Sequence, residues 1–195
     1  YLLRPLELLQ LLLLDVNGNI NEHRAGTARG SHGKGLAHHG FRKIAILNCH
    51  GGNSPIIQVL SREVRSELGI AVFIINCGAF FGNQAVKDTV TPGNIWDFHG
   101  GEMETSMVLA ERPETVKLET SEAGIPRKFM RNKTFTVYGP ITLGWVSEEW
   151  ETEDGKPIGI GGDPSGATAE KGNQIYDSFV ESILSGLKEI RKWKD

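Results

Sequence analysis

Two short stretches of this chain place a histidine among glycines and close to amide or carboxylate side chains. The first runs Asn-Cys-His-Gly-Gly-Asn over residues 48–53, and the second runs Asp-Phe-His-Gly-Gly-Glu-Met-Glu-Thr-Ser over residues 97–106. Each lies where an apolar segment ends or a helical pattern begins. Imidazole and carboxylate groups in such positions are typical of metal or hydrolytic sites. The two stretches therefore favour an enzyme.

In the first stretch, His50 follows an apolar run that is typical of a buried strand, and parallel sheets bind ligands at the carboxyl ends of their strands. A neutral imidazole there can bind Zn²⁺, Mn²⁺ or Fe²⁺. Gly51 and Gly52 leave backbone N–H groups free near the start of the next helix, which suits a bound anion or substrate oxygen. We therefore expect Gly51, Gly52 and Asn53 to contact substrate. The alternative is that His50 only hydrogen-bonds its own loop.

In the second stretch, His99 immediately precedes a predicted helix that carries Glu102 and Glu104. A histidine and a carboxylate this close can supply a metal ligand and a general acid or base. Asp97 can orient the His99 ring, and we count Glu102 among the catalytic candidates. The alternative for Glu102 is that it only complements the helix dipole in the first turn. Trp96, in the loop before His99, is a candidate substrate contact.

The elements that must position these residues follow from apolar periodicity. Residues 43–49 and 70–77 read as buried strands, and residues 56–68 between them have helical spacing that Gly69 ends. Asn53 or Ser54 can cap this helix. Strand, helix and strand in this order predict a βαβ unit with parallel strands. Residues 2–14 read as a buried helix or a strand-like core segment.

The second half of the chain is richer in loops. Residues 78–98 read as a long loop that forms a pocket wall together with the Trp145 and Trp150 region. The other elements predicted here are a helix over residues 102–111, a strand over 134–138, an ordered loop over 139–166 and a long helix over 167–194.

Composition sets limits on the class of protein. The 195 residues suit a single domain, and a net charge of -3 gives no reason to expect nucleic acid or an acidic membrane surface as a partner. Residues 2–14 are too short and too polar to span a bilayer and lack a secretory cleavage site, so we expect a cytoplasmic protein without a membrane partner. Cys49 and Cys77 read as two buried free thiols in a reducing compartment, with a disulfide as the alternative.

Taken together, the motifs resemble the creatininase (creatinine amidohydrolase) family. The resemblance covers residues 36–195, and its specificity comes from the order in which several segments occur. These segments are HHGFRK at 38–43, the first stretch at 48–53, the second stretch at 97–106 with LAERP at 109–113, GDP at 162–164 and ATAEKG at 167–172.

The resemblance implies an α/β fold of three layers, α/β/α, with a mostly parallel central sheet. It implies a divalent metal centre (Zn, Mn or Fe, two per site in an intact member) and a homo-oligomer, often a hexamer. The implied reaction is hydrolysis of a non-peptide C–N bond, of cyclic amide or formamide type, in a small-molecule substrate by a metal-activated water. By motif position, His50 and Glu104 match metal ligands, and His99 matches the histidine that handles protons at the substrate.

Two departures from the family pattern bear on function. In creatininase itself a Tyr and a Glu follow the first histidine, whereas this chain has Gly51 and Gly52, which points to the broader family with its deformylase-like and peptide-processing members. The family's upstream Glu-x-His-Gly segment is not found, since Glu22 and His23 are adjacent. Residues 1–35 are therefore expected to be atypical or truncated. The alternative function is a catalytically incomplete fragment or binding module. A phosphate or nucleotide site at residues 51–55 is weaker, because no Walker-type Lys or dinucleotide glycine pattern accompanies it.

Overall fold

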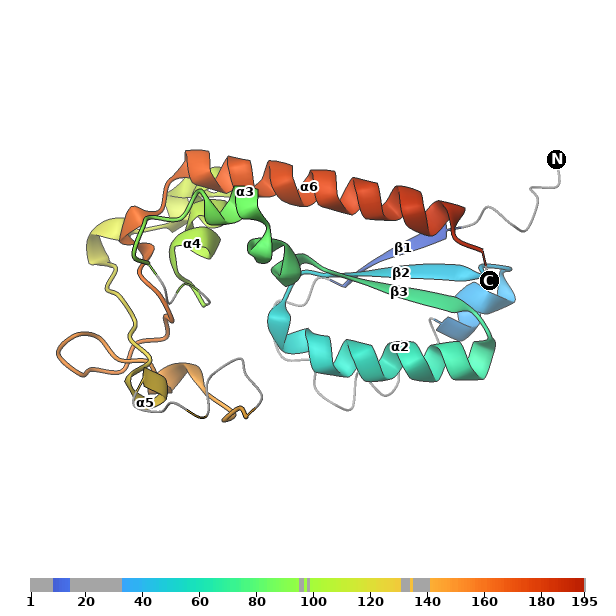
Figure 1. Cartoon of the computed structure of the whole chain (residues 1–195), viewed down its shortest axis with the longest axis horizontal. Coiled ribbons are helices and arrows are strands. Elements are labelled where there is room, and N and C mark those ends of the chain that lie inside the picture. The colour runs from blue at the N-terminus through green and yellow to red at the C-terminus, as the bar shows by residue number, and fades with distance from the viewer. Residues whose placement is uncertain are drawn as a thin grey trace. The chain divides into compact units, whose positions relative to one another are not determined.

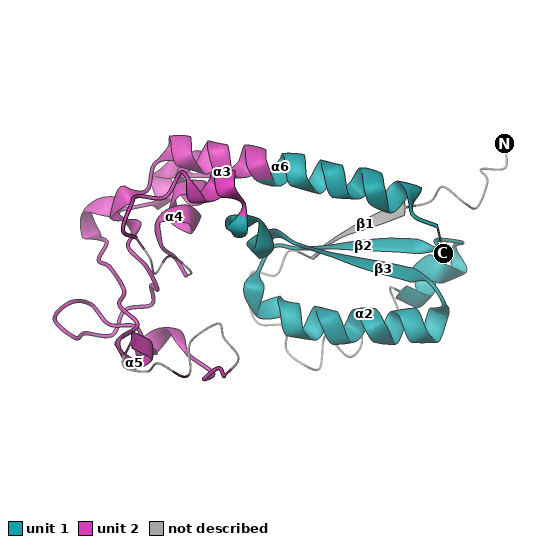
Figure 2. Ribbon diagram, in the orientation of Figure 1, with its two compact units in different colours: residues 1–82, 179–195 teal, residues 83–178 magenta. Residues whose placement is uncertain are grey.

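The structure is a computed structural model, and it describes residues 9–14, 33–94, 97, 99–130, 134 and 141–194. Residues 9–14 are described by their backbone only. The chain divides into two compact units, which are unit 1 with residues 1–82 and 179–195 and unit 2 with residues 83–178 (Figure 2). The single domain that the length predicts stays a prediction.

Unit 1 contains, among the described residues, a parallel sheet of three strands in the order β1-β2-β3. β1 spans Leu9–Leu14, β2 spans Lys43–Asn48 and β3 spans Ala71–Asn76. The parallel pairing of β2 with β3 is confirmed, and over residues 9–14 the strand is correct and the alternative of a helix is wrong. The register pairs Asn48 with both Leu14 and Asn76, so the three strands end together at one edge of the sheet.

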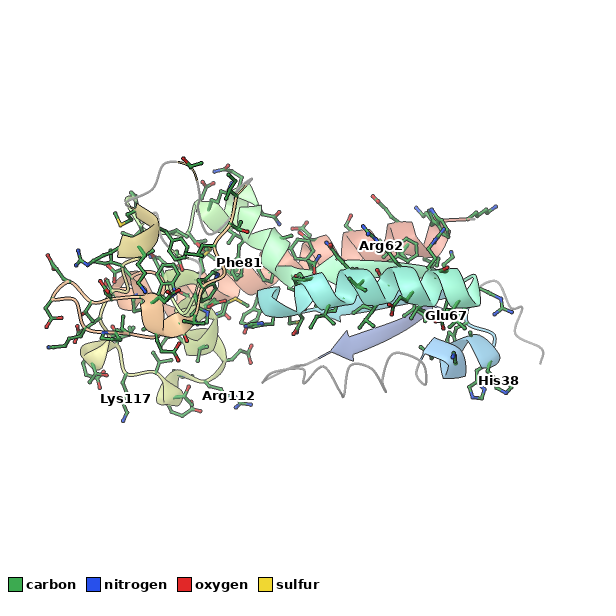
Figure 3. All side chains as sticks on the ribbon, turned by 90° about the horizontal axis from the view of Figure 1, so that it is seen from below. His38, Arg62, Glu67, Phe81, Arg112 and Lys117 are labelled. Atoms are coloured by element: carbon green, nitrogen blue, oxygen red, sulfur yellow. The ribbon has the colours of Figure 1, made fainter. Side chains whose placement is uncertain are left out.

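Helices cover both faces of this sheet in unit 1 (Figure 1). α2 (Ser54–Leu68) lies on one face and contacts β3, while its charged residues Arg62 and Glu67 are exposed (Figure 3). The last part of α6 (Ala169–Lys192) lies on the other face. Unit 1 therefore has the three-layer α/β/α architecture that the family resemblance implies. No helix in the described part of the chain has both the length and the apolar character needed to cross a membrane.

The two ends of α2 are set in different ways. Gly69 ends the helix with a φ of 61°, which confirms the predicted stop, because this left-handed conformation suits glycine. At the other end Asn53 occupies the N-cap position but makes no side-chain capping bond. The Ser54 hydroxyl instead accepts a hydrogen bond from Asn48 Nδ2 at 3.0 Å. The predicted N-cap position of Asn53 is therefore confirmed, but its side chain does not make the capping hydrogen bond.

The C-terminal end of α6 is fastened to the start of β2 by one lysine. Lys43 Nζ donates hydrogen bonds to the carbonyl oxygens of Ile190 (3.1 Å), Arg191 (3.0 Å) and Trp193. A cation at this position satisfies carbonyl groups that the helix itself leaves unpaired and favours the negative end of its dipole. The ring of Trp193 also packs edge-on against Phe73 of β3, with ring centroids 5.4 Å apart.

The ends of β2 and β3 also place the two cysteines of the chain. Both are free thiols, as predicted. Cys77 is buried, but Cys49 is exposed, so its predicted burial is wrong. The reason is that β2 ends at Asn48, one residue earlier than the apolar run suggests, which leaves Cys49 in the turn beyond the sheet.

Unit 2 consists mainly of short helices and loops. The helix predicted over residues 102–111 is confirmed as α4 (Glu102–Glu111). The region 78–98 is less irregular than predicted, because it contains most of a 3₁₀ segment and the short helix α3 (Gln84–Lys87). The strand predicted over 134–138 lies, except for Thr134, outside the described residues. Unit 2 also contains the short helix α5 (Arg127–Met130). The 3₁₀ segments among the described residues are η1 (Gly51–Asn53), η2 (Cys77–Gly82), η3 (Pro113–Thr115), η4 (Leu118–Thr120), η5 (Ser147–Glu149) and η6 (Pro164–Gly166).

Trp150 is the centre of the core of unit 2 and is fully buried. Its ring stacks on Phe129 with centroids 5.9 Å apart, and it meets Trp145 edge-on at 5.7 Å. The ring of Trp150 therefore belongs to the core, and the predicted place of the Trp145 and Trp150 region in a pocket wall stays a prediction. Residues 141–166 are ordered around this core by isolated bridges, as predicted for a loop rather than a linker.

Within unit 2, α4 packs very closely against the first turns of α6 at Gly172. A Cβ atom on Gly172 would lie 2.0 Å from the Ser106 carbonyl oxygen, which is backbone and cannot rotate away. Ser106 is fully buried, and its hydroxyl accepts the Thr168 N–H at 3.2 Å just before α6 begins. The start of α6 is thus held against the helix that follows His99.

We predict that Gly172→Ala destabilises the protein by about 3 kcal/mol, because the clash outweighs the better helix propensity of alanine. Gly186→Ala, in the same helix with nothing within 4 Å of the added methyl group, is the matched control and should be stabilising by about 0.5–1 kcal/mol. Urea unfolding of both variants measures the difference. Equal effects of the two substitutions would contradict the close packing at Gly172.

Candidate active site

The first histidine lies in unit 1, directly after the end of β2. His50 is exposed and precedes the turn η1, and its Nδ1 accepts the Gly52 N–H at 3.2 Å. An accepting Nδ1 carries no proton, so in the neutral ring the proton is on Nε2. This hydrogen bond is the one expected from the alternative interpretation, in which His50 only hydrogen-bonds its own loop.

A buried asparagine fixes the backbone of His50. Asn48, the last residue of β2, is 1% exposed, and its Oδ1 accepts the His50 N–H at 3.3 Å. Its Nδ2 donates to Ser54 Oγ at 3.0 Å and to Asn76 Oδ1 at 2.8 Å. One side chain therefore links the end of β2, the end of β3 and the start of α2. This positioning role of Asn48 was not predicted from the sequence, although Asn48 begins the first motif.

The predicted substrate contacts near His50 differ in their accessibility. Gly51 and Gly52 are exposed, and a Cβ on Gly52 would lie 3.1 Å from the imidazole, so a larger residue would displace the ring. Asn53 is buried, and its Nδ2 has no hydrogen-bond partner within the described residues. Trp96 lies outside the described residues.

The second histidine lies in unit 2 and is held by its backbone and by one ring contact. His99 donates its N–H to the Gly161 carbonyl at 3.1 Å and accepts the Gly161 N–H at 2.6 Å. Its partly exposed ring meets Trp145 edge-on, with centroids 5.6 Å apart and an interplanar angle of 61°. Its ring nitrogens make no hydrogen bond within the described part of the chain. The imidazole is therefore oriented by packing while both of its nitrogens remain open to a ligand.

Glu104 turns back toward the loop before α4. Its Oε2 accepts the Gly100 N–H at 2.5 Å, and Oε1 has no partner among the described residues. Gly100 has a φ of 65°, a conformation that glycine adopts without strain and that points its N–H at the carboxylate. The carboxylate is thus fixed at one oxygen and available for a ligand at the other.

Asp97 caps the N-terminus of α4. Its Oδ2 accepts the Met103 N–H at 2.9 Å, and it makes no hydrogen bond to the His99 ring within the described residues. Burial raises the pKa of Asp97 to about 6, helped by the negative charges of Glu102 and Glu104. The geometry therefore gives Asp97 a helix partner, and its predicted role in orienting His99 stays a prediction.

Glu102 is the most enclosed of the four acidic or imidazole groups in this stretch, with 1% exposure. Its oxygens accept the Thr91 N–H (3.0 and 3.1 Å), the Thr91 hydroxyl (2.8 Å), Asn94 Nδ2 (2.9 Å) and Lys171 Nζ. Burial alone would raise the pKa of Glu102, but the bonds from Lys171, Asn94 and Thr91 hold it below its ordinary value. A saturated, buried carboxylate is poorly suited to proton transfer, so these contacts give no support to a catalytic role for Glu102.

The partners of Glu102 were not predicted from the sequence. Lys171 also donates to the Gly166 carbonyl oxygen at 2.8 Å and to the Thr91 hydroxyl at 3.2 Å. Lys171 lies in the ATAEKG segment, three residues after Thr168, and such a spacing is typical of the start of any helix. A single basic residue in a first helical turn, where acidic residues are favoured, was the available signal.

A cavity of about 390 Å³ opens in unit 2 beside this cluster. Its lining includes Thr91, Asn94, Glu102, Gly124 and Asp163. Residues of the predicted pocket-forming segment 78–98 therefore do line a cavity. The volume is in the range of small-molecule sites.

The predicted site residues therefore form two groups. Unit 2 brings together Asp97, His99 and Glu104 around the start of α4, and unit 1 holds His50 with its glycines. In the described residues, no three His, Cys, Asp or Glu side chains form a group that could hold a metal ion. Catalytic metal centres normally take three protein ligands, so His50 and Glu104 do not complete such a site by themselves.

Comparisons with known proteins all find similarity to the same family. The creatininase model, described as creatinine amidohydrolase, matches residues 28–187. The mycofactocin precursor peptide peptidase of Mycobacterium ulcerans (strain Agy99) is 27% identical over 151 residues, which cover 77% of this chain and 49% of that protein. The creatinine amidohydrolase of Pseudomonas putida is 28% identical over 164 residues, which cover 79% and 58%. The chain thus spans about half the length of these curated relatives.

Solved creatininase structures share the fold. A creatininase variant complexed with creatine superposes with a TM-score of 0.57 at 24% identity, over 86% of this chain and 65% of that chain. The structure named Creatininase Mn gives a TM-score of 0.54 at 23% identity, over 85% and 64%. The predicted α/β fold and family resemblance are confirmed.

We predict that Lys171→Met destabilises the protein by about 3–5 kcal/mol, because it leaves the buried Glu102 carboxylate without its cation. Lys34→Met is the matched control, since Lys34 and Glu67 form an ion pair in which both side chains are 62% exposed. That substitution should leave the free energy of unfolding nearly unchanged. Chemical denaturation of both variants decides; comparable small losses would show that the Glu102 cluster contributes little.

We predict a pH-dependent difference between Asp97→Asn and wild type. The pKa of Asp97 is about 6 in the folded protein, above its ordinary 3.8, so the folded state binds this proton more tightly. The contribution of Asp97 to stability therefore falls as pH rises between these two values, whereas asparagine does not titrate. The variant should gain stability relative to wild type from about pH 4 to about pH 6 and then level off. Urea unfolding across this range measures it, and a flat or falling difference would contradict the raised pKa.

Proposed function

The chain belongs to the creatininase family, and on that basis we propose that it carries catalytic residues of a hydrolase that cleaves a carbon–nitrogen bond other than a peptide bond. The substrate is a small molecule with a cyclic amide or formamide group. The observation that supports this best is the state of His99. Its ring is held by Trp145 and partly exposed, and both ring nitrogens are uncommitted within the described residues.

In this proposal His99 transfers a proton to the leaving nitrogen of the substrate. Imidazole suits this role because it exchanges protons near neutral pH. The paired hydrogen bonds with Gly161 fix the backbone of His99, so the ring approaches substrate from a constant position. Asp97 serves the same end indirectly, by capping the helix that starts next to His99.

Metal dependence is part of the proposal, with Zn, Mn or Fe as the cation. A divalent cation in such a site polarises a carbonyl group and activates water at neutral pH. Glu104, with one oxygen fixed by Gly100, and His50 are the ligands that this chain offers. Further ligands have to come from outside the described residues, since no three candidate side chains group within them.

The cavity beside Thr91, Asn94 and Asp163 is the proposed place of substrate selection. Its volume of about 390 Å³ suits a small polar substrate, and its polar groups can orient an amide by hydrogen bonds. Gly51 and Gly52 replace the larger residues of creatininase itself, so we propose a substrate other than creatinine. A homo-oligomer, a hexamer by family resemblance, and a cytoplasmic location belong to the same proposal.

A second candidate function is a catalytically incomplete fragment or binding module. The observation that favours it is the lack, among the described residues, of three side chains grouped as metal ligands. Metal analysis of the purified chain separates the two candidates. Near-stoichiometric Zn, Mn or Fe supports the hydrolase, and no metal even after reconstitution supports the incomplete fragment.

We predict that His99→Ala lowers turnover of a cyclic amide or formamide substrate by about 10²–10⁴-fold while metal content stays that of wild type. The reason is that His99 moves protons and does not hold the metal. His38→Ala, which removes an exposed histidine in residues 33–38 (Figure 3), is the control and should leave both properties unchanged. Steady-state kinetics and metal analysis are measured on the same preparations. A parallel loss of metal and activity in His99→Ala would make His99 a ligand.

A further inference from the structure

The two cysteines of the chain face each other at the edge of the sheet that carries His50. They are the only cysteines in the sequence. Their sulfur atoms are 3.7 Å apart, and both are free. Asn48 and Asn76 are paired in register at the ends of β2 and β3, so Cys49 and Cys77 occupy the next matched positions.

The backbone around this pair suits a disulfide. Neighbouring strands lie about 4.8 Å apart, and disulfides join Cα atoms that are about 4.4–6.8 Å apart. A disulfide needs a sulfur–sulfur distance of about 2.05 Å, so side-chain rotation and small shifts of the turn have to close the remaining gap. The hydrogen bond from Asn48 Nδ2 to Asn76 Oδ1, at 2.8 Å, keeps the adjoining strand ends together.

The two thiols differ in accessibility, which gives them different roles. Cys49 is exposed and Cys77 is 8% exposed. Burial raises the pKa of Cys77 to about 12, and the hydrogen bond and charge of Cys49 add to this effect. Cys77 is therefore a protonated thiol in the reduced protein, and a reagent in solution reaches Cys49 first.

We propose that Cys49 and Cys77 form a reversible disulfide by exchange with a small disulfide such as glutathione disulfide. The Cys49 thiolate attacks one sulfur of glutathione disulfide, forms a mixed disulfide and releases one glutathione thiolate. Cys77 then loses its proton and attacks the Cys49 sulfur, which releases the second glutathione thiolate. The protein loses two electrons and two protons, and one glutathione disulfide is reduced to two glutathione thiols.

The second step is favoured by the first. The Cys77 sulfur is already adjacent to the sulfur that it must attack. Closure of the bond would restrain the turn that begins with His50, because the His50 backbone follows Cys49 directly. The inference does not depend on the proposed hydrolase.

The test is equilibration of the purified chain with graded ratios of reduced to oxidised glutathione, followed by thiol titration and peptide mapping without reduction. Wild type should lose both thiols together and yield a peptide pair linked through Cys49 and Cys77. Cys77→Ala should stop at a mixed disulfide on Cys49. Cys49→Ala, which changes an exposed position and should fold normally, should keep the buried Cys77 thiol unmodified.

Three results would overturn the proposal. These are wild type that keeps both thiols under oxidising conditions, wild type that stops at the mixed disulfide, and disulfides that link two chains. The peptide map of wild type decides even if Cys77→Ala does not fold. Because the readout is covalent and not catalytic, failure here leaves the hydrolase proposal untouched, and failure of that proposal leaves this one testable.

Discussion

The buried carboxylate of Glu102 is the constraint on which the arrangement of unit 2 depends. A charge with 1% exposure is tolerated only if it is paired and its lone pairs are satisfied. Thr91, Asn94 and Lys171 supply these partners from a loop and from the first turns of α6. Gly166 must lack a side chain, since its Cβ would lie 2.9 Å from Glu102 Oε1. The start of α4, and with it the backbone next to His99, is therefore fixed by one charge.

Three acidic residues near the start of α4 have different environments, and this separates their possible roles. Glu102 is saturated by donors and stays ionised. Asp97 receives the Met103 N–H, but its burial outweighs this bond and raises its pKa to about 6. Glu104 keeps one oxygen without a protein partner in the described residues. The three carboxylates differ because the fold surrounds them with different numbers of hydrogen-bond donors. Glu104 is therefore the carboxylate best placed to bind a ligand.

The sequence predicted the elements whose signals are local. Gly69 ended a clear helical pattern, and Pro113 followed the end of α4, so these boundaries were correct. The sequence also located the two histidine motifs, because glycines and carboxylates around an imidazole are visible in the chain itself. What it could not give were contacts between distant segments, such as the ion pair between Glu102 and Lys171.

Burial was the property that the sequence predicted least well. Trp150 stands among polar residues and was predicted to form part of a pocket wall, but its ring fills the core of unit 2. Cys49 belongs to an apolar run, but it lies one residue beyond the strand and is exposed. In both cases the outcome depends on the three-dimensional surroundings, which no local pattern of residue types contains.

The hydrogen bond between His50 and Gly52 shows how glycine at position 52, where this chain differs from creatininase itself, affects the chemistry of the imidazole. While Nδ1 accepts the Gly52 N–H, Nε2 carries the proton and can donate to a substrate oxygen but cannot bind a cation. Ligation through Nε2 would move the proton to Nδ1, where it would oppose the Gly52 N–H, so the turn would have to open. Glycine at position 52 permits both states, because a Cβ there would lie 3.1 Å from the ring and restrict the imidazole. The tautomer of His50 and the conformation of its glycine turn are therefore coupled, and a restraint on the adjoining strand ends would act on both.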